Sequence, residues 1–388
     1  MEFMLSKNRK IKLALGFSDI SLIPGESTVD PNDVDVSWQL GEQKFELPIL
    51  AAAMDGVVDV NIARMFGEWG GLGVLNLEGI YTRYDDYQAI LDRIVAADND
   101  EATKIFQEVY REPVKPELIA KRIKEIQAGG VKAAGSLTPA GMIRFGQVAE
   151  DSGIDILVLQ STVTSMRHRS QSGSVLDIGE LINRVKVPLM VGNVSGYEIT
   201  YSLMEAGADA IFVGVGPGQA CTTRGVTGVG VPQITATADC AAARDDFYVQ
   251  TGKYVAIITD GGMRKGGEIC KALATGADAI MTGSIFAGCP ESPATPYHWG
   301  MATPDPNLPR GTRVKSDVHV PLKQVLFGPS QVTDGTQNLV GAIKSSMGLC
   351  GAQTIREFHN TDIAFSFSFM TEGKALQIGQ QVGMGSKK

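Results

Sequence analysis

The sequence predicts an α/β protein built as a (β/α)8 TIM barrel. Eight short apolar runs recur along its 388 residues, and most are separated by segments with helical spacing. The runs are continuously apolar rather than alternating, which is typical of parallel strands buried on both faces. An open doubly wound sheet is the alternative. The predicted strands are residues 48–53, 72–77, 131–134, 154–159, 187–191, 210–213, 255–259 and 279–282.

A near-repeat favours the closed barrel over the open sheet. Residues 207–214 are Gly-Ala-Asp-Ala-Ile-Phe-Val-Gly, and residues 276–283 are Gly-Ala-Asp-Ala-Ile-Met-Thr-Gly. Each copy ends a helix with glycine and begins a strand. Equivalent units two strands apart suit a barrel, in which chemistry lies at the carboxyl ends of the strands and the last two loops commonly hold a phosphate.

Both of those last two loops have the composition of an anion site. The seventh run is followed by Asp260-Gly-Gly-Met-Arg-Lys-Gly-Gly, and the eighth by Gly283-Ser284. Backbone N–H groups in glycine turns and at helix starts attract anions. The pattern therefore predicts a phosphate site after strands seven and eight.

Two segments interrupt the barrel pattern within what we expect to be one catalytic domain over residues 1–388. Residues 81–130 are highly charged and predict a helical excursion after strand two; the apolar spacing at 118–126 has a solvated helical face as its alternative. Residues 289–316 contain six prolines, so we expect no regular structure there and interpret the stretch as a flap. Residues 360–388 are expected to form a C-terminal tail.

Composition argues against several classes of protein. A net charge of −8 disfavours nucleic acid as the main partner, because phosphate backbones reward clustered Lys and Arg. No stretch approaches the roughly 18 apolar residues of a membrane helix, and the amino terminus lacks a signal pattern, so we expect no membrane partner and a cytoplasmic location. Five scattered cysteines without a C-x-x-C pair, and four scattered histidines, argue against disulfide scaffolds and zinc sites.

The glycine-rich loop of residues 214–230 carries the strongest chemical signal. It presents Cys221 just ahead of Thr222, Thr223 and Arg224. Glycines allow the backbone to approach a ligand closely, and hydroxyl and cationic neighbours favour a thiolate. This is how a chain presents a nucleophile. The alternative is a small buried cysteine in a loop that is glycine-rich for other reasons, because cysteine is among the most buried residue types.

Several motifs together resemble one family. They are Cys-Thr-Thr-Arg at 221–224, Asp260-Gly-Gly, Gly283-Ser284, Gly192-Asn193, Ala51-Ala-Ala-Met-Asp-Gly-Val, Phe17-Ser-Asp-Ile-Ser-Leu-Ile-Pro and Ser345-Ser-Met-Gly-Leu-Cys-Gly. With these motifs the chain resembles the IMP dehydrogenase and GMP reductase family, except in the two interrupting segments. The resemblance implies a (β/α)8 barrel that acts on purine nucleoside monophosphates with a nicotinamide cofactor. It also implies a homotetramer, with an octamer as the alternative.

The resemblance assigns roles to individual residues. Cys221 would add as a thiolate to C2 of the purine, which makes that carbon a hydride donor or acceptor. Thr223 matches the hydroxyl associated with water activation, and Asp260 would hold the ribose hydroxyls. The other substrate residues would be Met54 near the base, Gly262, Gly283 and Ser284 at the 5′-phosphate, and Gly300 and Met301. The cofactor residues would be Gln160, Ser161, Asn193 and Gly214, and the carbonyls of Gly216, Gly218 and Cys221 match a potassium site.

The flap departs from both branches of the family. Reductases carry a flap glutamate and dehydrogenases an Arg-Tyr pair, whereas residues 297–315 contain no glutamate, and their arginines are Arg310 and Arg313. We expect one of these arginines to activate the hydrolytic water. Because arginine is a poor base at its usual pKa, this role requires a tightly held water. Binding of phosphate or solvent is the alternative.

Other positions depart from the family pattern as well. Gln219 stands where a phosphate-binding serine is usual, Phe212 where a basic residue is usual, and Gln160 where dehydrogenases carry an aspartate that contacts the cofactor ribose. The regulatory modules that most dehydrogenases insert after strand two are replaced by the segment 81–130. The sequence is thus similar to a third, IMP dehydrogenase-related branch.

We therefore expect an NAD-dependent IMP dehydrogenase that converts IMP to XMP in guanine nucleotide synthesis. The missing flap glutamate favours this, as do residues 227–236 and 345–349, which look closer to dehydrogenases. An NADPH-dependent GMP reductase is the second interpretation, favoured by the compact chain. The third is a nucleotide-binding sensor without turnover, which the altered flap permits and the intact Cys221, Thr223 and Asp260 oppose.

Overall fold

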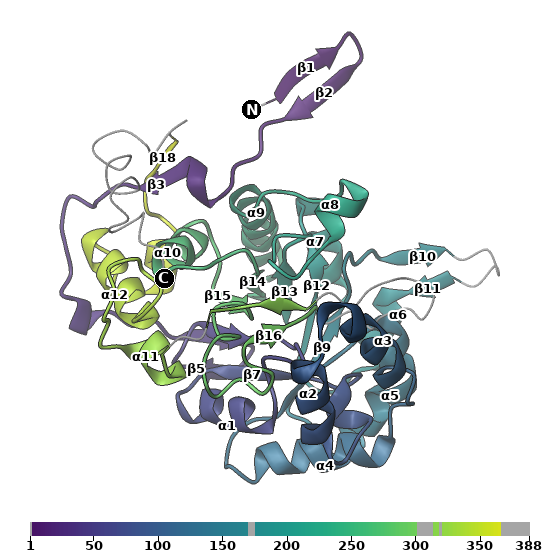
Figure 1. Cartoon of the computed structure of the whole chain (residues 1–388). Helices are drawn as coiled ribbons and strands as arrows, with labels where there is room; N and C mark the ends of the chain where they lie inside the picture. The colour runs from purple at the N-terminus through teal and green to yellow at the C-terminus, as the bar shows by residue number, and fades with distance from the viewer. Residues whose placement is uncertain (1, 170–174, 301–312, 318–319, 366–388) are drawn as a thin grey trace.

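The computed structural model describes residues 2–169, 175–300, 313–317 and 320–365 of the chain (Figure 1). Within them, eight parallel strands close into a barrel, and each pairs with the next in the order of the chain. The predicted (β/α)8 TIM barrel is confirmed, and the open sheet is wrong. The barrel strands are β6 (Ile49–Ala51), β7 (Leu72–Asn76), β8 (Ala134–Leu137), β9 (Ile156–Gln160), β12 (Leu189–Val194), β13 (Ala210–Val213), β14 (Ala256–Asp260) and β15 (Ala279–Thr282).

The third strand was predicted too early in the chain. Residues 131–134 were expected to form it, but β8 begins at Ala134 and continues through Gly135 and Ser136, which are not apolar side chains of the kind the prediction sought. Val131 instead packs against helix α1 (Val60–Glu68), where a Cβ on Gly67 would lie 2.5 Å from the Cβ of Val131. The apolar residue therefore serves helix packing rather than the strand.

Helices cover the outside of the barrel (Figure 1). The segments between or after the barrel strands form α1, α4 (Pro116–Gln127), α5 (Pro139–Asp151), α6 (Ile178–Arg184), α7 (Tyr197–Glu205), α8 (Thr223–Thr227), α9 (Gln233–Thr251), α10 (Gly266–Ala274), α11 (Leu322–Phe327), α12 (Leu339–Leu349) and α13 (Ile355–Phe358). Short 3-10 helices are η1 (Phe17–Asp19), η2 (Pro31–Asp33) and η3 (Ile80–Thr82).

The segment 81–130 is helical and divides into two parts. Its apolar positions Leu118, Ile119, Ile123 and Ile126, together with Arg122, are all buried, so these positions pack inward and do not form a solvated face. Helix α4 packs against α1 and α5 and is thus the barrel's own second helix. The insertion proper is the pair α2 (Tyr87–Ala96) and α3 (Asn99–Val109), which lies in front of the barrel in Figure 1.

The stretch after the last barrel strand contains regular structure, contrary to expectation. Strands β16 (Tyr297–His298) and β17 (Val314–Lys315) form an antiparallel hairpin, with Tyr297 opposite Lys315. Prolines did not prevent this, because none of the six lies within the four paired residues. Residues 301–312, which contain three of those prolines, lie outside the described residues.

Smaller sheets lie around the barrel. They are β1 (Glu2–Ser6) with β2 (Arg9–Lys12), β3 (Ile20–Leu22) with β18 (Ile363–Phe365), β4 (Trp38–Leu40) with β5 (Gln43–Phe45), and β10 (Arg167–Arg169) with β11 (Val175–Asp177). The β3–β18 pair brings the start of the expected C-terminal tail beside the amino-terminal segment. Nowhere in the described ranges is a helix both long enough and apolar enough to span a membrane.

Candidate active site

Cys221 lies in the loop between β13 and α8, at the carboxyl end of the barrel. Its side chain is exposed, so the alternative of a buried structural cysteine is wrong. The thiol donates to the hydroxyl of Thr223 over 3.2 Å between Sγ and Oγ1. The Cys221 backbone N–H donates to the carbonyl of Gly218 over 3.1 Å. The loop thus turns tightly just before the thiol and presents it beside a hydroxyl.

Arg224 shapes this loop through its backbone contacts. Its Nε donates to the carbonyl of Val215 over 3.0 Å, and its Nη2 donates to the carbonyl of Val231. Gly216 has φ of +72°, and a Cβ there would lie 2.7 Å from Cγ of Arg224. Glycine is needed at this position because the arginine side chain crosses it. The guanidinium therefore ties the two ends of the loop together.

Gln233, the first residue of α9, joins the last residues of two barrel strands. It is buried, and its Nε2 donates to the carbonyls of Val213 over 3.1 Å and Asp260 over 2.9 Å. Gly214 lies between these groups with φ of +151°, and a Cβ there would lie 2.4 Å from the Asp260 carbonyl oxygen. Gly214 was predicted from the family alone; the structure adds that this close approach of β14 requires glycine.

Three polar side chains converge at the mouth of the barrel. Asp260 ends β14, and its Oδ2 accepts from Asn193 Nδ2 over 2.7 Å and from Gln160 Nε2 over 3.0 Å. Gln160 Nε2 also donates to Asn193 Oδ1 over 2.9 Å. Burial raises the pKa of Asp260 to about 6, although the two amide donors act in the opposite direction. This carboxyl therefore changes its charge close to neutral pH.

In this cluster residue 160, where the family resemblance leads one to expect an aspartate in dehydrogenases, is a neutral amide. A neutral amide can lie 3.0 Å from the Asp260 carboxylate and donate to it, whereas a second carboxylate at that distance would repel it. The other amide atom of Gln160, Oε1, is buried and has no hydrogen-bond partner among the described residues. An unpaired buried acceptor at the mouth of the barrel is suited to a donor group on a bound molecule.

The loops after β14 and β15 lie against the rest of the site. Gly262 has φ of +83°, and a Cβ there would lie 3.0 Å from Cβ of Pro217 in the cysteine loop. A Cβ on Gly283 would lie 2.4 Å from Sδ of Met54, so the methionine after β6 reaches the end of β15. Ser284 follows and is half-buried. The structure thus brings the predicted base and phosphate residues to one end of the barrel.

Two further predicted residues, Ser161 and Gly300, lie beside this site. Ser161 exchanges backbone hydrogen bonds with the next strand: its N–H donates to Gly192 over 2.9 Å, and its carbonyl accepts from Asn193 over 3.1 Å. Gly300 lies against the cysteine loop, since a Cβ there would lie 3.8 Å from the Ala220 carbonyl oxygen. Met301 and Arg310 lie outside the described residues.

Arg313 has a different environment from the one that a water-activating base needs. It is 8% exposed, and its guanidinium donates to the carbonyls of Ile94, Val95 and Ala97 at the carboxyl end of α2. Its Cζ lies 4.0 Å from the centroid of the Tyr297 ring. Both Nη atoms are therefore engaged by backbone carbonyls, and Arg313 serves to hold the hairpin in this arrangement.

Comparison with known proteins shows the family of this chain. The family model described as "IMP dehydrogenase / GMP reductase domain" matches residues 14–301. The chain belongs to this family.

Relatives of this family member include both named and uncharacterised proteins. An uncharacterised oxidoreductase of Mycobacterium tuberculosis is 34% identical over 92% of this chain and 98% of its own length. An inosine-5′-monophosphate dehydrogenase of Aquifex aeolicus is 30% identical over 91% of this chain and 93% of its own length. A crystal structure of an IMP dehydrogenase/GMP reductase-like protein from Corynebacterium glutamicum superposes with a TM-score of 0.88 at 30% identity, covering 94% of this chain and 98% of that one.

Proposed function

We propose that this protein is an NAD-dependent IMP dehydrogenase that oxidises IMP to XMP for guanine nucleotide synthesis in the cytoplasm. The observation that carries the proposal is the exposed Cys221 thiol, hydrogen-bonded to Thr223 over 3.2 Å in a glycine-rich loop. A thiol in that position suits covalent addition to a purine carbon.

The nucleotide is held by residues on neighbouring loops. The Asp260 carboxylate accepts hydrogen bonds from the ribose hydroxyls, and the turns at Gly262 and Gly283 offer backbone N–H groups to the 5′-phosphate, with the Ser284 hydroxyl beside them. Met54 contacts the base. Phe212 is buried in the barrel wall, so the basic residue that relatives place there has no counterpart, and the phosphate depends on backbone donors.

The reaction begins when the Cys221 sulfur, as a thiolate, forms a bond to C2 of IMP; the π electron pair of the C2–N3 bond moves to N3, which takes up the proton lost by the thiol. The hydride at C2 then departs with its electron pair, which leaves the purine covalently bound to sulfur. Water adds to C2, the C2–S bond breaks, and XMP leaves as the thiol recovers a proton. Thr223, whose hydroxyl already accepts from the thiol, is placed to hold that water, and Arg310 is proposed to help activate it.

A nicotinamide cofactor fits the polar side of the mouth. Gln160, Ser161, Asn193 and Gly214 would hold it, and the unpaired buried Oε1 of Gln160 is suited to a ribose hydroxyl or carboxamide donor. When bound, NAD accepts the hydride. The carbonyls of Gly216, Gly218 and Cys221 are the proposed potassium ligands; Gly218 already accepts one N–H, and a carbonyl oxygen has a second lone pair for a cation.

A GMP reductase that uses NADPH is the second candidate, because the chain has α2–α3 in place of the regulatory modules of most dehydrogenases. Compactness alone does not decide for it. An inosine-5′-monophosphate dehydrogenase of Cryptosporidium parvum aligns over 379 residues, covering 90% of this chain and 91% of its own length. A relative of similar length therefore carries the dehydrogenase name.

We further propose a homotetramer, with an octamer as the alternative.

Absorbance at 340 nm tests the proposal, with purified protein in potassium buffer. A rise with IMP and NAD supports the dehydrogenase, and a fall with GMP and NADPH would make the protein a reductase. Absence of both changes, together with nucleotide binding in calorimetry, would favour the sensor. Cys221→Ser is the control, because a variant that kept full turnover would exclude the covalent route.

A further inference from the structure

Tyr110, just after α3, joins two elements that border the candidate active site. Its hydroxyl donates to Asp55 Oδ2 over 2.6 Å and accepts from Trp299 Nε1 over 2.8 Å. All three side chains are buried. A buried hydroxyl that both donates and accepts at these distances fixes its partners relative to each other, since losing it leaves polar groups unpaired.

The two hydrogen bonds of the Tyr110 hydroxyl, to Asp55 and from Trp299, form a bridge. Asp55 attaches this bridge to the loop after β6. It follows Met54, and its carboxylate also accepts from Asn76 Nδ2 over 3.0 Å and from the Ile80 N–H over 2.8 Å. Its backbone carbonyl accepts from the Tyr81 hydroxyl over 2.6 Å. The loop that carries Met54 is thus held from several directions, and it offers Tyr110 a fixed attachment point.

Trp299 anchors the bridge to the hairpin. It follows β16, and a Cβ on Gly56 would lie 3.1 Å from Cζ3 of its ring. The next residue, Gly300, packs against the Ala220 carbonyl, one residue before Cys221. The residue that follows Trp299 therefore lies next to the cysteine loop.

The inserted helices α2 and α3, which precede Tyr110, also hold β17, the second strand of the hairpin. Arg313, immediately before β17, donates to carbonyls at the end of α2, over 3.2 Å in the case of Val95. Those carbonyls carry partial negative charge at a helix terminus, which favours a buried cation there. Both strands of the hairpin are consequently attached to α2–α3 and not only to the barrel.

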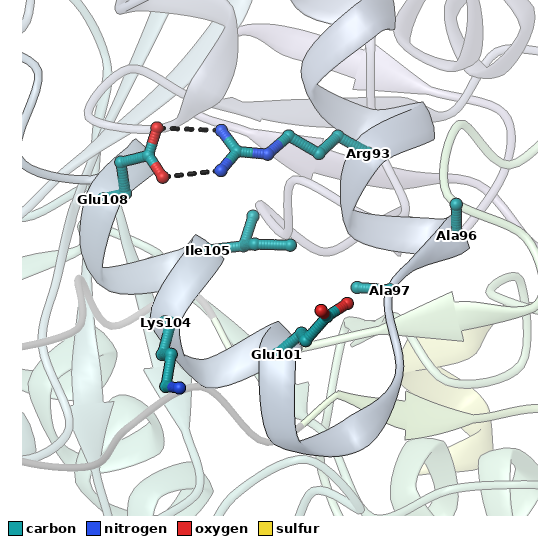
Figure 2. A pocket seen from close by; sticks show the side chains of 7 residues that line it. All are labelled: Arg93, Ala96, Ala97, Glu101, Lys104, Ile105 and Glu108. Carbon is teal, nitrogen blue, oxygen red and sulfur yellow. Dashed lines mark hydrogen bonds and ion pairs between the residues drawn. The ribbon is translucent and has the colours of Figure 1, made fainter.

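Helices α2 and α3 are also joined to each other by an ion pair. A cavity of about 480 Å³ lies between the helices, and at one end of it Arg93 binds Glu108 through two hydrogen bonds of 2.8 and 2.6 Å (Figure 2). Phe106 of α3 packs edge-on against Trp299, with ring centroids 5.0 Å apart. The inserted helices thus form a support for the hairpin that is not part of the barrel.

We propose that Tyr110 is a positioning residue, which orders the β16–β17 hairpin against the Cys221 loop so that the inserted helices set the rate of turnover. This inference rests on the proposed function and assigns the inserted helices a task in it. Tyr110 touches no reacting atom in this scheme; it acts through Trp299 and Asp55.

Tyr110→Phe tests the proposal, because it removes the hydroxyl and keeps the ring. We expect kcat for IMP oxidation to fall about tenfold, since small displacements of supporting elements cost catalysis heavily. The dissociation constant for IMP should stay within about twofold, because the ribose and phosphate groups are held by the loops after β14 and β15. Equal losses in both quantities, or an unchanged kcat, would overturn the proposal.

Tyr84→Phe is the matched control. The Tyr84 hydroxyl donates over 3.1 Å to the carbonyl of Val109, the residue before Tyr110, so this variant removes a tyrosine hydroxyl close to Tyr110 without breaking the hydrogen bonds of Tyr110 itself. It should keep the wild-type kcat. Trp299→Phe should reproduce the loss seen in Tyr110→Phe, and the double variant should lose nothing further. Losses that multiply would show two independent effects and refute the bridge.

Hydrogen exchange provides a readout that needs no turnover. The Ser316 amide, which donates to the Pro296 carbonyl over 2.7 Å across the hairpin, should exchange faster in Tyr110→Phe than in the wild type, and at the wild-type rate in Tyr84→Phe. If the wild type proves inactive with IMP, the proposed function fails while this measurement still tests the positioning. Unchanged exchange in Tyr110→Phe would overturn the positioning role whatever the activity.

Discussion

Asn193 Nδ2 lies 2.7 Å from Asp260 Oδ2, and this contact joins the ends of β12 and β14, which are separated in the barrel by β13. Gln160 reaches the same oxygen from β9, over 3.0 Å. Three strands therefore meet at one carboxylate oxygen. A change in the charge of the Asp260 carboxyl consequently alters the hydrogen bonds of both Asn193 and Gln160.

The pKa of Asp260, raised by burial to about 6, predicts pH-dependent nucleotide binding. The ionised carboxylate accepts from ribose hydroxyls and the protonated form does so poorly, so affinity for IMP should increase as the pH rises through about 6. Calorimetric titration between pH 5 and 7 measures this, with about a tenfold change expected, since one pKa unit corresponds to 1.36 kcal/mol. Asp260→Asn should lose that dependence.

The binding experiment needs a control for the charge of the nucleotide itself. A phosphate monoester also titrates near pH 6, so the difference between the wild-type and Asp260→Asn curves carries the result; identical curves would exclude the ribose contact.

The raised pKa of Asp260 also affects the stability of the fold, because the folded-state pKa of about 6 exceeds the reference value of 3.8. The stabilising contribution of Asp260 is therefore complete below pH 3.8 and is lost as the pH rises through about 6.

Gln160→Asp should impair the site although it restores the residue that dehydrogenases carry. A second carboxylate beside Asp260 would raise its pKa further and remove the amide donor. We expect about tenfold weaker binding of IMP at neutral pH, with partial recovery at higher pH as Asp260 ionises. Gln160→Asn, which is neutral but shorter, is the control and should show no such pH recovery.

Cys221 should be the cysteine that alkylates first. Cys240, Cys270 and Cys289 are buried, and burial raises the pKa of the Cys240 and Cys270 thiols to about 12. Mass spectrometry after brief iodoacetamide treatment should find the label on Cys221, and IMP should slow the labelling by at least about tenfold. Faster labelling at any buried cysteine would contradict the assignment of Cys221 as the accessible nucleophile.

Arg244→Met should destabilise the fold without touching the site. Arg244 and Asp278 are both buried and paired over 3.1 Å, so the variant leaves a buried carboxylate without its cation. We expect a loss of about 3 kcal/mol in urea unfolding. Lys253→Met removes a more exposed pair with Asp209 and should cost less than about 1 kcal/mol. Equal losses of unfolding free energy in Arg244→Met and Lys253→Met would mean that the burial of an ion pair does not determine the cost of breaking it.

Sequence patterns predicted the barrel because its strands are buried on both faces and therefore leave short but continuous apolar runs. The prediction failed at β8, where Gly135 and Ser136 replace large apolar residues; a Cβ on Gly135 would lie 2.4 Å from Cδ1 of Leu77, so the wall there has no space for a side chain. Cys221 and Asp260 were found because glycine turns mark the loops around them. Periodicity alone could not have shown that their strands are adjacent.

The residues that sequence reasoning missed act through long-range contacts. Tyr110 and Trp299 are separated by 189 positions, and Asp55 and Tyr110 by 55, so no local pattern joins them. Gln233 lay within a motif noted for its resemblance to dehydrogenases, but its amide bonds to two strand ends appear only in the folded chain. A buried polar side chain has a meaning that depends on its partners, which a single sequence does not reveal.

The anchors at Trp299 and Arg313 bear on how this stretch of chain can evolve. Once both ends of a loop are fixed, doubling its length costs only about 0.6 kcal/mol of closure entropy. Changes in the length of the chain between the two anchors therefore cost little stability compared with loss of the anchors themselves. The chain between these anchors can therefore be lengthened or shortened while the contacts of Trp299 and Arg313 stay in place.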